Sequence, residues 1–204
     1  MKFIGLIIMG YLSGSIMFAY YLPMLLKKVD IRELSDDGNP GVHNAFKYAG
    51  MACGIFVLIL ELLKGAAPVY IAARCAETSN LVFALVMVAP VIGHAFPLYS
   101  RGRKGGKCIA VSFGVLLGLF PNMLPVLILA FYYLLFSLVI IITPDRVKTM
   151  ASFACFILSA IALGIPRAVA AGCALITITV IIRHIIKKPE EEKVQLRLAF
   201  HNRK

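Results

Sequence analysis

The sequence predicts an all-α fold, a polytopic integral membrane helix bundle with about seven transmembrane helices. Three observations predict this class. Hydrophobic residues make up 60% of the 204 residues, and the mean hydropathy is +0.88. Charged residues make up 15%, whereas a soluble domain carries about 25%. Apolar runs recur from end to end, which favours a chain embedded throughout its length over a soluble domain with an anchor.

Seven apolar segments approach the length of about 20 residues that a helix needs to cross a bilayer. The first, 3–26, is too long for a signal-peptide core and lacks an Ala-x-Ala-like cleavage site, so we expect a retained helix. The stretch 108–142 exceeds one span and is best divided at Pro-Asn-Met, 121–123, while 149–186 is divided at Gly-Ile-Pro-Arg, 164–167. Short pieces beside these breaks leave re-entrant or half-spanning helices as an alternative. The predicted helices cover 3–26, roughly 49–73, 81–99, 108–121, 123–142, 149–164 and 168–186.

Lysines and arginines are distributed unevenly between the two sides of this arrangement. With an outside amino terminus and seven spans, the outside segments hold only Lys2, Arg74 and Arg167. Since cytoplasmic loops carry an excess of basic residues, we expect the N-terminus outside and the C-terminus in the cytoplasm. The inside segments then hold Lys27, Lys28, Arg32, Lys47, Arg101, Arg103, Lys104, Lys107, Arg146, Lys148 and the tail from Arg183.

We expect a membrane domain, 1–188, and a short charged cytoplasmic tail, 189–204, for which an interfacial helix is an alternative. The net charge of +11 comes from basic residues that flank membrane segments, away from any aromatic stacking surface. Topology and anionic ligands explain that charge better than nucleic acid does. The cysteines stand singly in apolar segments and form no metal-binding pattern, so we expect buried free thiols; they are Cys53, Cys75, Cys108, Cys155 and Cys173.

A polar stretch, DGNPGVHN at 37–44, lies just before the second predicted helix. Its glycines allow positive φ and close backbone approach, and successive N–H groups form a concave anion nest. A helix that begins nearby adds its positive end. Asn39 and Asn44 supply further donors, and Lys47 supplies positive charge. A tight turn followed by a helix cap explains the same residues and stays open.

A second glycine-rich stretch, RGRKGGK at 101–107, follows GHAFP at 93–97 and precedes a helix that begins near Cys108. A cytoplasmic loop accounts for the four basic residues but not for the three glycines, which cost conformational entropy. Lysine binds phosphate as a point charge, and glycine lets the backbone take part. The spacing is not that of a Walker A loop. Two such loops on one face predict a phosphate-binding site.

Several polar residues interrupt the apolar segments. Glu61 and Lys64 lie three apart and can pair on one helix face, either as a structural ion pair or as part of the site. Ser15 belongs to a run of small residues that suits helix packing or the approach of a ligand. Ser152 and His184 lie near predicted cytoplasmic helix ends, where histidine can act as acid or base, although an ordinary interfacial position explains both. No hydrolase motif is present.

Seven short motifs follow one another along nearly the whole chain: SGSIMF at 13–18, DIR at 30–32, DGNPGVHNAFK at 37–47, LELLKG at 60–65, GHAFP at 93–97, RKGGK at 103–107 and RH at 183–184. In order and approximate spacing they resemble the bacterial membrane glycerol-3-phosphate acyltransferases that use acyl phosphate. The resemblance implies a multi-pass protein of the bacterial cell (inner) membrane with its site facing the cytoplasm. It also implies transfer of a fatty acyl group from acyl phosphate to the sn-1 hydroxyl of glycerol 3-phosphate, which gives lysophosphatidic acid and phosphate in phospholipid biosynthesis.

The resemblance, together with the chemistry of the residues, assigns roles to single positions. We expect substrate binding by Ser15, Gly38, Asn39, Gly41, Lys47, His94, Lys104, Gly105, Gly106 and Lys107, and catalytic roles for Asn44, Ser152 and His184. The 38–41 loop would cradle the acyl-phosphate head, while Lys47, Lys104, Lys107 and Ser152 would hold glycerol phosphate. Because acyl phosphate is already activated, catalysis needs positioning and electrostatic stabilisation rather than a metal or another cofactor. His184, His94 or the departing phosphate would take the hydroxyl proton. Membrane lipids are the expected surroundings, and the oligomeric state stays open.

Two other functions fit parts of the pattern. A transporter or flippase of a phosphorylated metabolite or lipid also uses broken helices and basic loops, although no inverted repeat is visible. A catalytically silent scaffold of lipid synthesis stays open because Asp37, His43 and Lys187 depart from the family pattern. A metal-dependent CDP-alcohol phosphotransferase would need an aspartate-rich motif, of which 36–38 is only a fragment.

Overall fold

The computed structural model describes residues 2–35, 38–100, 105–186 and 193–199 and is helical over most of them. Three positions singled out above, Asp37, Lys104 and Lys187, lie outside the described residues. The helices are α1 (Lys2–Ser15), α2 (Phe18–Lys27), α3 (Ile31–Leu34), α4 (Val42–Ala49), α5 (Met51–Cys75), α6 (Phe83–Ala95), η1 (Leu98–Ser100), α7 (Ile109–Leu117), α8 (Leu124–Leu134), the π-helix η2 (Leu135–Val139), α9 (Asp145–Ala162) and α10 (Arg167–Ile186).

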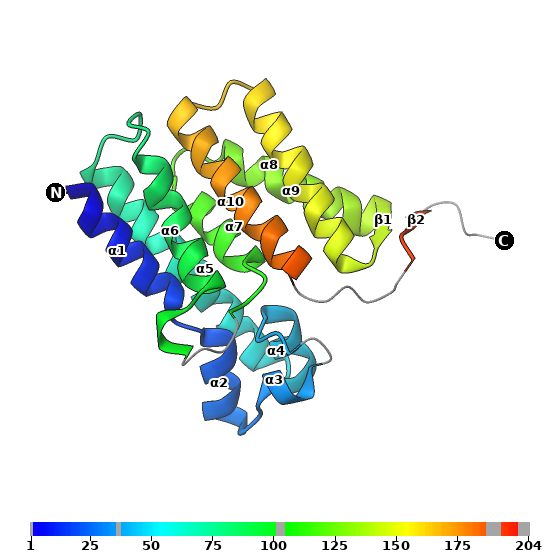
Figure 1. Cartoon of the computed structure of the whole chain (residues 1–204). Coiled ribbons are helices and arrows are strands. Elements are labelled where there is room, and N and C mark those ends of the chain that lie inside the picture. Colours follow the sequence, from blue (N-terminus) through cyan, green and yellow to red (C-terminus); the bar gives the residue numbers. More distant parts are fainter. Residues whose placement is uncertain (1, 36–37, 101–104, 187–192, 200–204) are drawn as a thin grey trace.

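The longer helices form a bundle, and three short ones gather at one end of it (Figure 1). Within the bundle, α6 packs against α1 and α10, α5 packs against α7, and α9 packs against α8 and α10. The short helices α2, α3 and α4 pack on one another and on the beginning of α5. This arrangement brings the two predicted glycine-rich loops, which precede α4 and α7, to the same end of the bundle.

The long apolar helices agree with part of the predicted membrane topology. Among the described residues, three helical stretches are long and apolar enough to cross a membrane: Lys2–Lys27, Met51–Cys75 and Arg167–Ile186. The stretches Phe83–Ala95 and Leu124–Val139 are shorter apolar helices. The 9 residues of α7 reach only about 14 Å, which is less than the hydrocarbon core of about 30 Å. The helix predicted over 108–121 is therefore shorter than one span.

The predicted helix 3–26 is not continuous, because it breaks after Ser15 and resumes at Phe18. The break is stabilised by two charged side chains of α5. Lys64 Nζ donates a 2.7 Å hydrogen bond to the carbonyl oxygen of Ile16, and the N–H of Ala19 donates to Glu61 Oε1 at 3.2 Å. Groups that the interrupted backbone leaves without helical partners are thus paired with side chains.

The predicted pairing of Glu61 with Lys64 is confirmed. Their Nζ and Oε2 atoms lie 2.8 Å apart in the bundle interior, where Glu61 is 1% and Lys64 is 4% exposed. Lys64 also contacts His94 Nδ1 at 2.8 Å, and His94 Nδ1 lies 3.3 Å from Glu61 Oε2. We call these three residues the buried triad. It connects α5 with α6 and with the break between α1 and α2.

Small residues let α1 and α6 approach closely, as the packing interpretation of the 13–15 run predicted. A Cβ at Gly14 would overlap with the backbone of Pro90, and a Cβ at Gly93 would overlap with the backbone carbonyl of Tyr11. Any larger side chain at either position therefore has to separate the two helices.

A small sheet is a departure from the all-α prediction. The strand β1 (Ile140–Thr143) pairs antiparallel with β2 (Gln195–Leu198), with Ile140 opposite Leu198 and Thr143 opposite Gln195. The predicted helix 123–142 was therefore too long, since helical structure ends at Val139. The alternative of an interfacial helix in the tail was wrong over Gln195–Leu198. A run of β-branched residues favours a strand once a partner strand is available, and that partner comes from a distant part of the chain.

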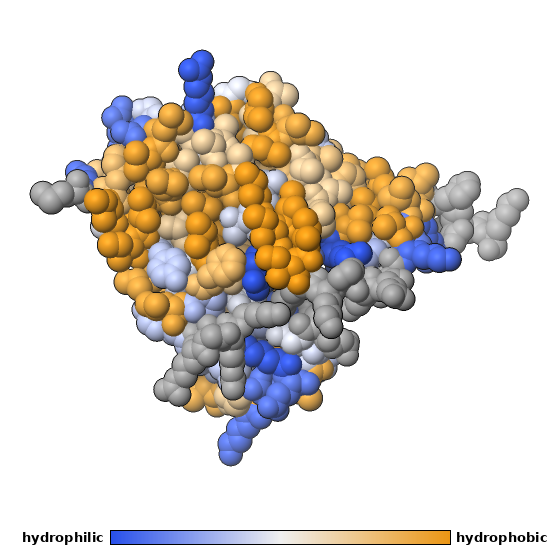
Figure 2. Space-filling model, viewed as in Figure 1, coloured by the Kyte–Doolittle hydropathy of each residue, from blue (hydrophilic) through white to orange (hydrophobic). Residues whose placement is uncertain are grey.

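Apolar side chains are both buried inside the bundle and exposed on its outside. The main core includes Phe83, Met87, Phe153 and Phe156, and a smaller core lies under the short helices. Large apolar side chains such as Leu25, Leu127 and Leu158 are at least 60% exposed. Figure 2 shows this apolar surface over the bundle, with hydrophilic residues concentrated toward the end that carries the short helices. An apolar surface of this kind fits contact with lipid.

The cysteines are free thiols, as predicted, but not all of them are buried. Cys53, Cys108 and Cys173 are buried, whereas Cys155 is half-buried and Cys75 is exposed. The prediction of burial was wrong for Cys75 because this residue ends α5, where the helix leaves the packed bundle.

Breaking the buried ion pair should destabilise the protein strongly. We expect Glu61→Leu to lower the free energy of unfolding by about 3–5 kcal/mol, because it leaves the Lys64 ammonium buried without its counter-charge. The double variant Glu61→Leu/Lys64→Leu should recover part of this loss. Denaturant unfolding in detergent measures both changes, and a double variant less stable than the single one would contradict the explanation.

The backbone at Cys108 offers a second test. This residue has a φ of 67°, in the left-handed region, which costs a side chain with a Cβ about 1–2 kcal/mol. Glycine avoids that strain, but it gives the unfolded chain more conformational freedom, which lowers the stability of the folded protein by about 0.5–1 kcal/mol. We therefore expect Cys108→Gly to be more stable than the matched variant Cys108→Ala by about 0.5–1 kcal/mol. Thermal unfolding measures this difference. A higher midpoint temperature for Cys108→Ala than for Cys108→Gly would contradict the explanation.

Candidate active site

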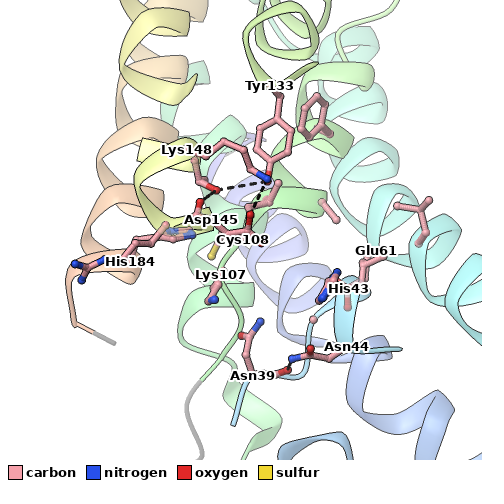
Figure 3. Close-up of a pocket in the computed structure, with 18 of the residues that line it drawn as sticks. Asn39, His43, Asn44, Glu61, Lys107, Cys108, Tyr133, Asp145, Lys148 and His184 are labelled. Atoms are coloured by element: carbon pink, nitrogen blue, oxygen red, sulfur yellow. Dashed lines mark hydrogen bonds and ion pairs between the residues drawn. The ribbon is translucent and has the colours of Figure 1, made fainter. Parts of the chain in front are cut away.

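A cavity of about 1090 Å³ opens between the short helices and the bundle (Figure 3). Most of its polar lining comes from loops and from the ends of helices and strands: Asn39, His43, Asn44, Lys47, Lys107, Thr143, Asp145, Arg146, Lys148, Thr149 and His184. Glu61, His94 and Tyr133 add polar groups from within helices. Its apolar lining comes from helix interiors: Leu58, Leu62, Ile109, Ala110, Phe113, Leu117 and Val126. Ile109, Phe113 and Leu117 are spaced four apart, so they follow one face of α7. The cavity thus joins a cationic polar region to an apolar wall.

The first glycine-rich stretch forms a turn that places Asn39 in the cavity. Gly38 has a φ of 60°, and its N–H donates to the carbonyl of Ser35 at 3.0 Å. The carbonyl of Asn39 accepts from the N–H of Gly41 and from the side-chain amide of Asn44, both at 2.9 Å. The predicted tight turn before a helix is therefore confirmed, with Gly41 at the N-cap of α4. The turn and the cavity lining coincide, so the two interpretations are compatible.

The described part of the second glycine-rich stretch, residues 105–107, packs on the end of α6. The N–H of Gly106 donates to the carbonyl of His94 at 3.2 Å. A Cβ at Gly105 would overlap with the His94 carbonyl, and a Cβ at Gly106 would overlap with His94 Nε2. Only glycine therefore allows this close approach, after which Lys107 lines the cavity.

His94 belongs to the buried triad and is 5% exposed. Its ring nitrogen Nδ1 is engaged inside the triad, 2.8 Å from Lys64 Nζ and 3.3 Å from Glu61 Oε2. The other ring nitrogen, Nε2, lies against Gly106. The geometry favours a role for His94 in holding the loop over the role of proton acceptor.

His184 lies in the last turn of α10 and lines the cavity. Its Nδ1 is 2.8 Å from the carbonyl oxygen of Val180. A carbonyl only accepts, so Nδ1 carries a proton and the lone pair of the neutral ring is on Nε2. In this tautomer, Nε2 is the nitrogen that can accept a proton from a substrate.

The opposite wall comes from the start of α9, which the sequence assignment of roles largely missed. Lys148 Nζ pairs with Asp145 Oδ1 at 2.7 Å and lies 5.6 Å from the ring centre of Tyr133 (Figure 3). The Thr149 hydroxyl donates to the carbonyl of Asp145 at 2.9 Å. Nε of Arg146 is buried without a hydrogen-bond partner in the described part of the chain. Basic residues had been noted at 146 and 148, but nothing local indicated that they would face the loops at 38–44 and 105–107.

Charge around Asp145 is mixed. Desolvation acts to raise the pKa of Asp145, but the hydrogen bond and charge of Lys148, with His43 and Lys107 nearby, hold that pKa below its ordinary value. Asp145 lies in the first turn of α9, ahead of the predicted span. It is therefore a carboxylate at neutral pH and balances one of the surrounding cations.

Seven of the predicted site residues line the cavity: Asn39, Gly41, Asn44, Lys47, His94, Lys107 and His184. Five described ones do not: Ser15, Gly38, Gly105, Gly106 and Ser152. Both serine side chains are fully buried, and each donates to a carbonyl of its own helix, Ser15 to Tyr11 and Ser152 to Lys148, at 2.8 Å. Lys104 lies outside the described residues. Among the described residues, no group of three or more His, Cys, Asp or Glu side chains is placed to hold a metal ion.

Comparisons with known proteins agree with this picture. The family model described as glycerol-3-phosphate acyltransferase matches residues 4–188. A glycerol-3-phosphate acyltransferase of Myxococcus xanthus is 40% identical over 118 residues, 58% of this chain and 60% of the relative. Glycerol-3-phosphate acyltransferase 2 of Thermotoga maritima is 40% identical over 109 residues, 53% of this chain and 54% of the relative. The matched region thus spans somewhat more than half the length of these curated relatives.

Two solved structures share the fold. The crystal structure of PlsY (YgiH), an integral membrane glycerol 3-phosphate acyltransferase, in its glycerol 3-phosphate form has a TM-score of 0.79 and 28% identity, covering 91% of this chain and 89% of that one. The lysophosphatidic acid form has a TM-score of 0.74 and 26% identity, covering 90% and 88%. The mostly helical, apolar architecture therefore matches that of an integral membrane protein. On the family match over residues 4–188, the chain belongs to the glycerol-3-phosphate acyltransferase family.

Proposed function

We propose that the protein transfers a fatty acyl group from acyl phosphate to the sn-1 hydroxyl of glycerol 3-phosphate, giving lysophosphatidic acid and phosphate. The observation that carries this proposal is the cavity, in which cationic and amide side chains adjoin an apolar wall. Such a lining suits a ligand with an anionic head and an apolar chain. The two PlsY structures, described as glycerol 3-phosphate and lysophosphatidic acid forms, support the same substrate and product.

The anionic groups would be bound from both sides of the cavity. Lys47 and Lys107 contribute from α4 and from the loop before α7, while Arg146 and Lys148 contribute from α9. Lysine binds phosphate as a point charge, and arginine adds directed donors. Asn39 would cradle the acyl-phosphate head, and the cations would hold the phosphate of the acceptor.

The acyl chain would lie along the apolar wall. Leu58 and Leu62 of α5 line the cavity together with Phe113 and Leu117 of α7. Within a membrane the acyl chain gains little by leaving lipid, which is itself apolar. The apolar wall instead keeps the acyl chain out of water, where exposure would cost about 0.8 kcal/mol per methylene. Meanwhile the acyl carbonyl is held at the polar end of the cavity.

The reaction needs no acyl-enzyme. The sn-1 oxygen attacks the acyl carbonyl carbon, its bond to that carbon forms, and the bond between the carbonyl carbon and the phosphate oxygen breaks. The hydroxyl proton passes to Nε2 of His184 or to the departing phosphate. Holding the sn-1 hydroxyl next to the acyl carbonyl accelerates the reaction by positioning, and the surrounding cations stabilise the developing charge.

The proposed location follows from the charge distribution. Basic residues among the described ones, such as Lys47, Lys107 and Lys148, lie around the cavity beside the short helices, which supports an amino terminus outside, a carboxyl terminus in the cytoplasm and a cavity that opens to the cytoplasm. A bacterial inner membrane is the corresponding location. The family match over residues 4–188 supports a membrane acyltransferase domain at 1–188, with 189–204 as a charged cytoplasmic tail.

The first prediction concerns the reaction. Purified protein given palmitoyl phosphate and glycerol 3-phosphate, without metal or acyl-CoA, should release phosphate and form lysophosphatidic acid, detected by mass spectrometry. The isosteric variant Asn39→Asp should lose about tenfold or more of this activity, because it places a negative charge beside bound phosphate. Folded protein that moves either substrate across vesicles without forming product would favour the transporter instead.

The second prediction concerns the hydroxyl groups of α9. We expect Thr149→Val, which removes a hydroxyl from the cavity lining, to lower kcat/KM about tenfold. Ser152→Ala should have the smaller effect, because Ser152 does not line the cavity, whereas Thr149 does. Steady-state kinetics of both variants decides this. A larger loss in Ser152→Ala would restore the role that the family resemblance assigned to Ser152.

A further inference from the structure

Arg183 is a buried cation next to the site. It lies in the last turn of α10 and is only 3% exposed. Its Nη2 donates to the carbonyl of Gly105 at 2.6 Å, and its Nε donates to the carbonyl of Gly106 at 3.2 Å. The guanidinium carbon lies 5.4 Å from the ring centre of Phe96. These contacts join the end of α10 to a loop almost 80 positions earlier in the chain.

Packing alone does not call for an arginine at this position. Burying a guanidinium costs free energy that an apolar side chain of similar volume would not. Among the residues that the structure describes, no carboxylate pairs with Arg183, and the carbonyls of Gly105 and Gly106 solvate it instead. The neighbouring residue His184 lines the cavity, whereas Arg183 does not. The side chain therefore acts on the loop rather than on a ligand.

The two hydrogen bonds set the orientation of the loop backbone. In a planar trans peptide the C=O and N–H groups point in opposite directions. With the Gly105 and Gly106 carbonyls turned toward Arg183, the N–H groups of Gly106 and Lys107 point away from it. The N–H of Gly106 then reaches the carbonyl of His94, which the buried triad fixes. The loop is thus held on one side by α10 and on the other by α6, immediately before Lys107 enters the cavity lining.

We propose that Arg183 is a positioning residue, which clamps the backbone of Gly105 and Gly106 so that Lys107 is held in place for a phosphate-bearing substrate. The identity of that substrate rests on the proposed function. The clamp itself is a property of the loop and can be tested without the reaction.

Cys108 reports on the loop, because its buried thiol contacts the carbonyl of Gly106 at 3.6 Å. Alkylation by N-ethylmaleimide, followed by peptide mass spectrometry, gives the rate at which the Cys108 thiol is labelled in the intact protein. We expect Arg183→Met to speed labelling of Cys108 about tenfold, as the loss of a charge-assisted hydrogen bond allows. Labelling of Cys173, buried within α10, should not change. In Arg183→Lys, which keeps the charge but not the fork of donors, the labelling rate of Cys108 should lie between those of the wild type and Arg183→Met.

The matched control is Arg74→Met, which removes an arginine that stacks on Tyr70 near the C-terminal end of α5. In this variant, N-ethylmaleimide should label Cys108 at the wild-type rate. An unchanged rate at Cys108 in Arg183→Met would overturn the clamp. A joint rise at Cys108 and Cys173 would also overturn it, because Arg183 would then support the whole fold. If Arg183→Met does not fold, the labelling rates of Cys108 and Cys173 in Arg183→Lys, compared with those of the wild type, test the clamp instead.

Kinetics separate the clamp from the proposed function. In Arg183→Met the KM for glycerol 3-phosphate should rise about tenfold with a smaller fall in kcat, because a displaced Lys107 weakens binding. A fall in kcat alone would overturn the action through Lys107. If wild-type protein forms no product, the proposed function fails while the Cys108 labelling still decides the clamp.

Discussion

The structure depends on the buried triad of Glu61, Lys64 and His94. Charged groups inside an apolar bundle are tolerated only when each finds a partner, and here the partners come from three different helices. Lys64 binds the carbonyl of Ile16, and Glu61 accepts from the N–H of Ala19, so two backbone groups are paired where the chain leaves α1 and restarts as α2. That break is what lets the short helices form one side of the cavity.

The same triad reaches the site through His94. Its backbone carbonyl accepts from Gly106, and its ring lies against that glycine. The loop that delivers Lys107 therefore rests on a group whose position is set deep in the bundle. On the far side of the loop, Arg183 binds two consecutive carbonyls. Helices therefore hold residues 105–107 from both sides, and this suits a reaction that depends on positioning.

Much of the site was predictable, since the residues around 38–47, 93–107 and 183–184 combine glycine, amide and basic side chains in a chain that is otherwise apolar. What they do individually was less predictable. Gly105 and Gly106 serve close packing rather than lining the cavity, and Ser15 and Ser152 bond within their own helices. The wall formed by Arg146, Lys148 and Thr149 was missed because basic residues at a helix start have an ordinary explanation in membrane topology.

The sequence by itself determined the membrane class, the approximate helices and the ion pair of Glu61 with Lys64, because hydropathy and i,i+3 spacing are local properties. It also indicated the phosphate-binding chemistry, since residue types limit what a loop can bind. Only the tertiary structure decided the break near Ile16, the pairing of 140–143 with 195–198, and which residues line the cavity. Each of these depends on contacts between segments far apart in the chain, whose geometry no local pattern encodes.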